Sequence, residues 1–163
     1  MNLFWLDASA LAKRYLPETG TLLMNHLFAQ LPPSQMVCLW EGIGEVLSIL
    51  HRRRNAGLIS LHASQQAIVA LRTEILDQLE VEKIERTTAQ VMNSWELLDQ
   101  HALNSTDAMI LRCALDYAAT LQKVGHNLVM VSADVRLVRA AKAEGLQSVN
   151  PETNDVTFID AFL

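Results

Sequence analysis

Cysteine is scarce in this sequence, and the little that is present forms no pattern. The two cysteines, Cys38 and Cys113, stand far apart and make no CxxC or Cys/His metal motif. A chain of 163 residues buries roughly 70% of its unfolded surface, so its core needs no disulfide. The cysteine content therefore argues against a disulfide-stapled secreted domain and favours a reducing compartment.

Glycine and proline are also few, with six and four residues, and half of the chain is apolar. This composition excludes a disordered or collagen-like chain. The sequence contains no linker, internal repeat or low-complexity stretch. We therefore expect a single domain over residues 1–163.

Long hydrophobic runs and an excess of positive charge are absent as well. No apolar run approaches the about 18 residues that a membrane helix needs, and the first residues lack the basic start of a signal peptide. These absences predict a cytoplasmic protein. The net charge of −5 argues against a protein that holds nucleic acid through a broad basic surface.

Short apolar runs alternate with helical periodicity along the chain. Strands are expected near residues 3–6, 36–39, 81–84, 128–132 and 147–149, with helices between them, including one over 60–80 and one over 88–101. This order predicts an α/β fold in three layers, α/β/α, with a small and mostly parallel central sheet. Trp40, Trp95 and Phe158 are candidate interface anchors, although a tryptophan in a sequence of this kind is more often in the core, so no interface is assigned.

Two of the expected strands end in a carboxylate and turn directly into a helix. Asp7 follows the first strand and Asp134 follows the strand at 128–132. Ligands of open parallel sheets bind in the crevice at the carboxyl ends of the strands, which is where both acids would lie. Each aspartate is equally well placed to cap the helix that follows it.

Two further acids are candidates for the same site. Asp107 begins a strongly apolar helix, where a carboxylate also complements the helix dipole. Glu45 lies on the polar face of a helix, and Glu41 shares that face one turn earlier, so the spacing does not separate the two glutamates. Several carboxylates brought together repel one another unless a cation neutralises them, and Mg²⁺ and Mn²⁺ prefer oxygen ligands. The combination predicts a metal site.

Four short motifs carry a resemblance to a known family. They are residues 6–11 (LDASAL), residues 45–53 (EVLSILHRR), residues 105–111 (STDAMIL) and residues 131–137 (VSADVRL). In their order and spacing they resemble the successive motifs of PIN domains, and most of all those of VapC-type toxins from bacterial toxin–antitoxin pairs. The chain departs from the family's pattern before the third acid, where Asn104 to Thr106 lack the basic residue that many relatives carry.

The resemblance implies an endoribonuclease that depends on Mg²⁺ or Mn²⁺, with a homodimeric structure, an RNA substrate and a small antitoxin that blocks the acidic cleft. It implies a catalytic and metal-binding quartet and selects Glu45 over Glu41. Ser9 and Ser132 match small polar positions beside this site and are expected to support it by hydrogen bonds. The quartet consists of Asp7, Glu45, Asp107 and Asp134.

Three adjacent arginines, Arg52, Arg53 and Arg54, follow Glu45 on its helix and are possible RNA contacts, although they also suit a solvated helix end. Other catalytic schemes find less support, because the five histidines show no HxxxH or HExxH spacing and no P-loop or GxSxG is present. The alternative from another class is a catalytically inactive PIN-like module that binds a protein partner.

Overall fold

The first strand of the chain, β1, lies at the centre of a five-stranded sheet. The computed structural model describes residues 1–163 and orders the strands β3-β2-β1-β4-β5, with every neighbouring pair parallel. This confirms the expected parallel sheet. The strands are β1 (Asn2–Leu6), β2 (Met36–Leu39), β3 (Glu82–Ile84), β4 (Asn127–Val131) and β5 (Gln147–Val149).

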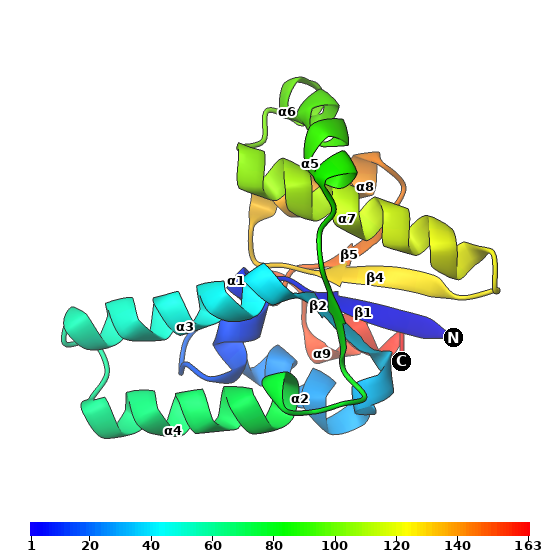
Figure 1. Cartoon of the computed structure of the whole chain (residues 1–163). Coiled ribbons are helices and arrows are strands. Elements are labelled where there is room, and N and C mark those ends of the chain that lie inside the picture. Colours follow the sequence, from blue (N-terminus) through cyan, green and yellow to red (C-terminus); the bar gives the residue numbers. More distant parts are fainter.

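Helices cover both faces of the sheet, which confirms the three-layer α/β/α fold (Figure 1). Side chains alternate along β1, so Phe4 and Leu6 pack against α1 to α4, while Leu3 and Trp5 pack against α6 to α8. The helices are α1 (Ala8–Leu11), α2 (Thr21–Gln30), α3 (Trp40–Asn55), α4 (Leu61–Leu71), α5 (Thr88–Asn93), α6 (Trp95–His101), α7 (Ser105–Gln122), α8 (Val135–Ala143) and α9 (Val156–Asp160). Short turns of other helix types are η1 (Ala12–Arg14), η2 (Pro33–Gln35) and η3 (Arg72–Leu76).

The chain builds one side of the sheet before it crosses to the other. It passes from β1 through β2 to β3, then returns through α5, α6 and α7 to β4 on the opposite side of β1. Leu6 is in register with Val131, so the turns that follow β1 and β4 lie next to each other. This switch point is the place where open α/β sheets form their ligand crevice.

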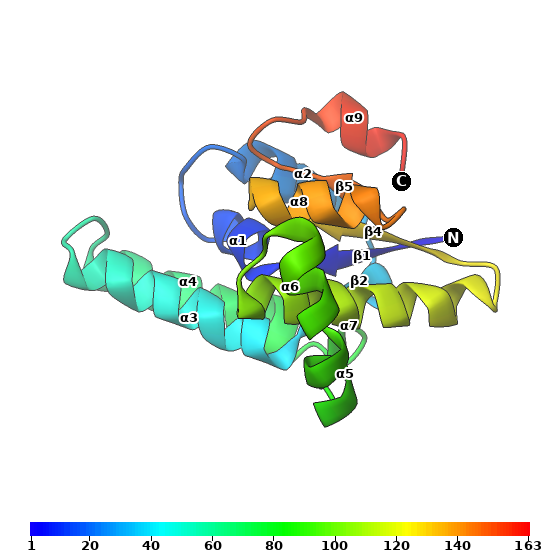
Figure 2. The ribbon, with the colours of Figure 1, turned by 90° about the horizontal axis from the view of Figure 1, so that it is seen from above.

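Helices α3 and α4 pack against each other and extend beyond the sheet as a long pair (Figures 1 and 2). Along α3, the buried face consists of Ile43, Val46 and Leu50, while Glu45, Arg52 and Arg53 stand on exposed positions. The first half of α3 therefore borders the crevice, and its second half forms a wall that runs away from the sheet. No helix in the structure has the length and apolar character to span a bilayer.

Two local expectations were wrong, and one helix was not expected. The helix expected over 60–80 ends earlier, because the Lys83 ammonium donates to the carbonyl oxygens of Ile75 and Gln78, and Leu79 beyond it is 94% exposed. The helix expected over 88–101 breaks at Ser94, whose hydroxyl donates to the carbonyl of Val91. The last helix, α9, had no counterpart in the sequence expectations.

The three aromatic side chains for which core and interface were both open all lie at the surface. Trp95 is 58% exposed, and Trp40 and Phe158 are exposed as well. Trp40 starts α3 at the rim of the sheet, and Trp95 starts α6 after the break at Ser94, so neither faces the core.

Candidate active site

Asp7 is the most buried of the four candidate acids and is held in one orientation. It leaves β1 and caps α1, where Oδ2 accepts hydrogen bonds from the Ser9 amide (3.2 Å), the Ser9 hydroxyl (2.5 Å) and the Ser132 hydroxyl (2.9 Å). The other oxygen, Oδ1, accepts no hydrogen bond within the protein. Burial raises the pKa of Asp7, and the hydrogen bonds from the serines oppose this effect.

Asp134 occupies the matching position after β4. Its Oδ1 caps α8 by accepting from the backbone amides of Arg136 (2.7 Å) and Leu137 (3.1 Å). Its Oδ2 has only the Arg136 guanidinium nearby, at 3.9 Å. The helix-cap interpretation is therefore correct for both strand-end aspartates, and each keeps one oxygen outside the cap.

Ser9 and Ser132 link the turns that carry these two aspartates. The Ser132 hydroxyl donates to Asp7 and accepts from the Asp134 amide at 3.1 Å, while the Ser9 hydroxyl accepts from the Ala133 amide at 2.9 Å. The two hydroxyl oxygens lie 3.2 Å apart. Each serine thus joins the first strand–helix turn to the second.

Asp107 enters from the other side of the crevice, in the first turn of α7. Asn104 caps this helix, because its side-chain oxygen accepts a hydrogen bond from the Asp107 amide (2.9 Å). Its side-chain amide group also donates to Asp107 Oδ2 (2.7 Å). The pKa of Asp107 is raised to about 6, first by burial and then by the negative charges of Asp134, Asp7 and Glu45. The structure therefore places Asp107 in the electrostatic field of the three other acids.

The two glutamates of α3 differ in their partners. Glu41 forms an ion pair with Arg86, whereas Glu45 makes no hydrogen bond or ion pair. The pKa of Glu45 is raised by burial and by the charge of Asp7, and Arg52 opposes the shift. Both glutamates border a small cavity of about 30 Å³ beside Asp7 and Thr106, which is large enough for a water-sized occupant.

These acids match a hard divalent cation in donor chemistry, since all four offer carboxylate oxygens. The charge of Asp7 raises the pKa of Glu45, and the charges of the other three acids raise the pKa of Asp107. They do not form a closed ligand set: no three acidic, histidine or cysteine side chains lie close enough together to hold a metal ion among them. The capping bonds of Asp134 and the Asn104 bond of Asp107 hold these two side chains where they are.

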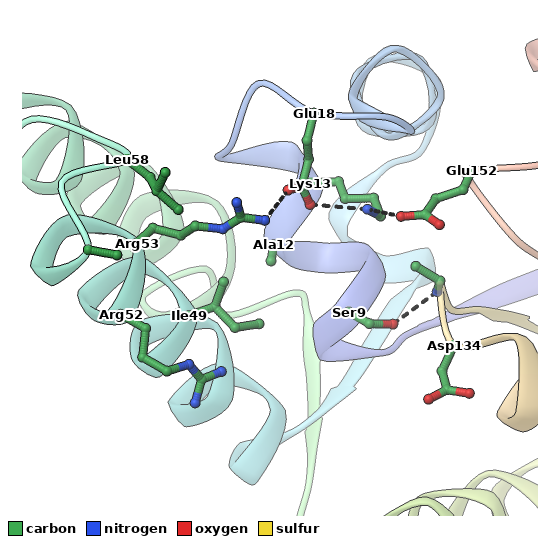
Figure 3. A pocket seen from close by; sticks show the side chains of 12 residues that line it. Ser9, Ala12, Lys13, Glu18, Ile49, Arg52, Arg53, Leu58, Asp134 and Glu152 are labelled. Atoms are coloured by element: carbon green, nitrogen blue, oxygen red, sulfur yellow. Dashed lines mark hydrogen bonds and ion pairs between the residues drawn. The ribbon is translucent and has the colours of Figure 1, made fainter.

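A larger cleft of about 570 Å³ adjoins the acids (Figure 3). Ser9 and Asp134 border one end, and the second half of α3 borders the other. Of the three arginines, Arg52 and Arg53 line this cleft, whereas Arg54 bonds to Asn55 at 3.0 Å and does not. The structure thus distinguishes Arg54 from Arg52 and Arg53, which the sequence pattern alone could not do.

The wall of this cleft contains a network of ion pairs around the buried Lys13 that no sequence pattern indicated. Lys13 is only 4% exposed, and its ammonium lies 3.0 Å from Glu18 and 2.6 Å from Glu152. Glu18 also accepts from Arg53 at 2.8 Å. No local signal distinguishes a buried lysine in an otherwise ordinary helical stretch, and Glu152 lies far along the chain.

Comparison with known proteins identifies the fold family. Residues 44–152, which include Glu45, Asp107 and Asp134, match the PIN domain family. No curated protein sequence matches the chain. The match to the family covers more than half of the residues.

Three solved structures share the fold at low sequence identity. PAE2754 from Pyrobaculum aerophilum has a TM-score of 0.62 at 17% identity, and the similarity covers 99% of each chain. The Mycobacterium tuberculosis toxin VapC20, described as cleaving the sarcin–ricin loop, has a TM-score of 0.60 at 20% identity over 90% of this chain and 98% of that one. FitAcB from Neisseria gonorrhoeae has a TM-score of 0.62 at 11% identity over 93% of this chain and 100% of that one. The chain belongs to the PIN domain family.

Proposed function

We propose that this protein is an endoribonuclease dependent on Mg²⁺ or Mn²⁺ and that it acts as the toxin of a toxin–antitoxin pair. The observation that carries the proposal is the position of four carboxylates around the switch point of the sheet, where the charges of the other three help raise the pKa of Asp107 to about 6. Membership of the PIN domain family and the likeness to VapC20, described as an RNA-cleaving toxin, support it.

The proposed quartet divides the work by position. Asp7, Asp107 and Asp134 would hold the ion directly, and Glu45 would hold it directly or through water. When bound, such an ion lowers the pKa of a coordinated water and offsets the charge that builds on a phosphodiester during in-line attack. Ser9 and Ser132 keep Asp7 Oδ2 occupied, so that Oδ1 is the oxygen left for binding. The arginines after Glu45 would guide the RNA backbone.

We further propose a small antitoxin that blocks the acidic cleft and a homodimeric toxin. Support for the antitoxin partner comes from the neighbours, since FitAcB and the FitAB complex bound to the IR36 DNA fragment share this fold, with TM-scores of 0.62 and 0.61. Co-expression with the candidate antitoxin should abolish RNA cleavage, and light scattering should give the mass of a dimer for the toxin alone.

The competing function, a catalytically inactive binding module, is favoured by one observation: the acids do not form a closed ligand set. Calorimetry separates the two, because a nuclease binds Mn²⁺ at Asp134 and an inert module has no reason to do so. An Asp134→Asn variant should then lose the binding heat.

The direct test of the nuclease is cleavage of structured RNA by the purified protein. Cleavage should require Mg²⁺ or Mn²⁺ and stop with EDTA. Asp7→Asn should abolish it without unfolding the domain, while Asp77→Asn, which makes the same change at an exposed position, should leave it intact. Cleavage that survives both EDTA and Asp7→Asn would exclude this mechanism.

A further inference from the structure

The cleft beside the acids has the size and position of a binding site that continues the active site. Its volume of about 570 Å³ falls within the roughly 300–1,000 Å³ of small-molecule pockets. Ser9 and Asp134 belong both to this cleft and to the acidic site. Figure 3 shows the cleft between α1 with η1, the second half of α3 and the turn that carries Asp134.

Most of the charged side chains in the cleft are already paired with one another, so few are free to bind a ligand. Lys13 and Arg53 are paired with Glu18, and Lys13 is also paired with Glu152, so these four residues neutralise one another. Arg52 lines the same cleft and forms neither an ion pair nor a hydrogen bond within the protein. Arg52 is thus the one cation of the cleft without a protein partner.

Arg52 also lies at a suitable distance from the acids to bind a neighbouring phosphate. It follows Glu45 by seven residues on α3, which is about two helical turns or roughly 10 Å along the same face. Its charge reaches Glu45, whose pKa it lowers. In Figure 3 the Arg52 guanidinium and the Asp134 carboxylate lie on opposite sides of one opening. A phosphate at Arg52 therefore lies near the acids without lying on them.

The rest of the cleft offers an apolar surface. Ile49 and Leu58 line it together with the methyl groups of Ala12 and Ala56, and Leu58 is 63% exposed. Flexible apolar side chains of this kind can pack against the face of a nucleobase. Proteins hold single strands with a positively charged groove and with side chains, most often aromatic, that pack against the bases. Arg52 beside this wall is an aliphatic version of that combination.

We propose that this cleft is a nucleotide subsite, in which Arg52 binds the phosphate next to the one that is cleaved and Leu58 with Ile49 packs against the adjoining base. The inference rests on the proposed nuclease function and deepens it. It assigns the role of RNA contact to Arg52 and gives Arg53 the structural role of bracing the cleft through Glu18.

The test uses the full chain and a probe that needs no catalysis. Adenosine 5′-monophosphate is titrated into ¹⁵N-labelled protein in EDTA, and amide shifts are followed by NMR. Saturable shifts are expected at Arg52, Leu58 and Ala133. Arg52→Ala should weaken binding on the order of tenfold, as expected for loss of a charge-assisted hydrogen bond. Arg72→Ala removes an exposed arginine that lines none of the described clefts and should bind as the parent does.

Two further measurements distinguish binding of the phosphate from binding of the base. Leu58→Ser should weaken binding of adenosine monophosphate but leave binding of inorganic phosphate unchanged. In RNA binding, Arg52→Ala should reduce the slope of log affinity against log salt by about 0.7, the contribution of one phosphate contact to a single strand. Arg52 and Leu58 are both exposed, so neither variant should compromise folding.

The outcomes distinguish this inference from the nuclease proposal. Absence of saturable shifts in the cleft, or an Arg52→Ala variant that binds as tightly as the parent, overturns the subsite even if the protein cuts RNA. Adenosine monophosphate bound in the cleft of a protein that cuts no RNA upholds the subsite and overturns the nuclease. With both upheld, Arg52→Ala should raise KM for RNA about tenfold with little change in kcat.

Discussion

Asp7 shows how one side chain combines a structural and a chemical role. Its Oδ2 takes all three hydrogen bonds, which cap α1 and hold the carboxylate in place, and its Oδ1 takes none. Burial raises the pKa of the carboxyl, and the serine hydroxyls lower it again. The two serines therefore help keep a buried acid ionised, which any role as a cation ligand demands.

Replacing Ser132 tests this support directly. Ser132→Ala removes a donor to Asp7 Oδ2 and the acceptor of the Asp134 amide, so we expect the affinity for Mn²⁺ to fall about 10- to 100-fold, as for other residues that orient metal ligands. Calorimetric titration at pH 7 measures this. Ser64→Ala is the matched control, because Ser64 is equally buried but its hydroxyl has no hydrogen-bond partner. Equal Mn²⁺ affinity in both variants would contradict the supporting role.

Asp107 predicts how pH acts on the site. Its pKa of about 6 means that a proton competes with the cation below this pH, so Mn²⁺ affinity should fall by up to about tenfold per pH unit there. Arg136 opposes the shift, and Arg136→Gln should therefore move the midpoint of the pH profile upward. A profile that is flat from pH 5 to 7.5 in the parent would exclude Asp107 as a ligand.

The same residue affects the stability of the metal-free protein, with the opposite pH trend. The folded state holds the Asp107 proton more tightly than the unfolded chain, whose aspartates titrate near 3.8. Its contribution to stability is therefore complete below about pH 4 and is lost as the pH rises through about 6. In urea titrations in EDTA, Asp107→Asn should flatten this decline, and a variant that declines as steeply as the parent would contradict it.

Secondary-structure elements differ in how far the sequence alone defines them. The units β1–α1 and β4–α8 could be predicted because each has an apolar strand, an aspartate and a helical pattern within a few residues. The break at Ser94 could not, because the apolar spacing continues across it and only burial of the serine in the folded protein ends the helix. Helix α9 has five residues, and its packing on α2 has no local signal.

The candidate site, like the secondary structure, could be predicted only where the signal lies within a few residues of the chain. Asp7 and Asp134 could be found from their local context, but the choice of Glu45 over Glu41 came only with the family resemblance. The physical difference is that Arg86 pairs with Glu41 from 45 residues away. Arg53 likewise finds Glu18 at a separation of 35 residues, so no local pattern shows that Arg52 alone stays unpaired.

The turn before α2 depends on a glycine. Gly20 has φ of +96°, and a methyl group there would lie 2.8 Å from the Lys13 side chain and 3.0 Å from the Pro151 carbonyl. Gly20→Ala should therefore destabilise the protein by about 1–3 kcal/mol. Gly44→Ala is the matched control. Gly44 lies in the middle of α3, where an added methyl group would contact nothing, so this substitution should stabilise the protein by about 0.5–1 kcal/mol. Urea unfolding measures both, and effects of the same sign would contradict the assignment.

Across the whole molecule, the four acids of the proposed quartet account for most of the net negative charge. The proposed quartet takes four of the 18 acidic residues and leaves 14 against 13 basic ones, a balance of −1 elsewhere. The net charge of −5 therefore excludes a broad electrostatic grip on nucleic acid but not a local one. A protein of this kind would depend on a cation and few arginines to hold RNA.

The proposed metal site also predicts that a bound cation stabilises the entire fold. At a hundredfold excess over its Kd, Mn²⁺ should add about 2.7 kcal/mol to the free energy of unfolding, which raises Tm by about 5–10 °C for a chain of this size. Thermal unfolding at pH 7.5 with Mn²⁺ and then with excess EDTA measures the gain and its reversal. The gain should be absent in Asp134→Asn. A Tm of the parent protein that does not change when Mn²⁺ is added would contradict the metal site.

The pairing of β1 with β4 sets the moment at which the site comes into being. Asp7 is made at the start of synthesis, but Ser132, the second of the two serines that bond to it, lies 125 residues later in the chain. A nascent chain that has not yet reached β4 has no Ser132 and no Asp134, and its first strand lacks a neighbour on one side. Under the proposed function, ribosome-bound and prematurely terminated chains are therefore harmless to the cell that makes them. On that proposal, activity begins only when β4 pairs with β1.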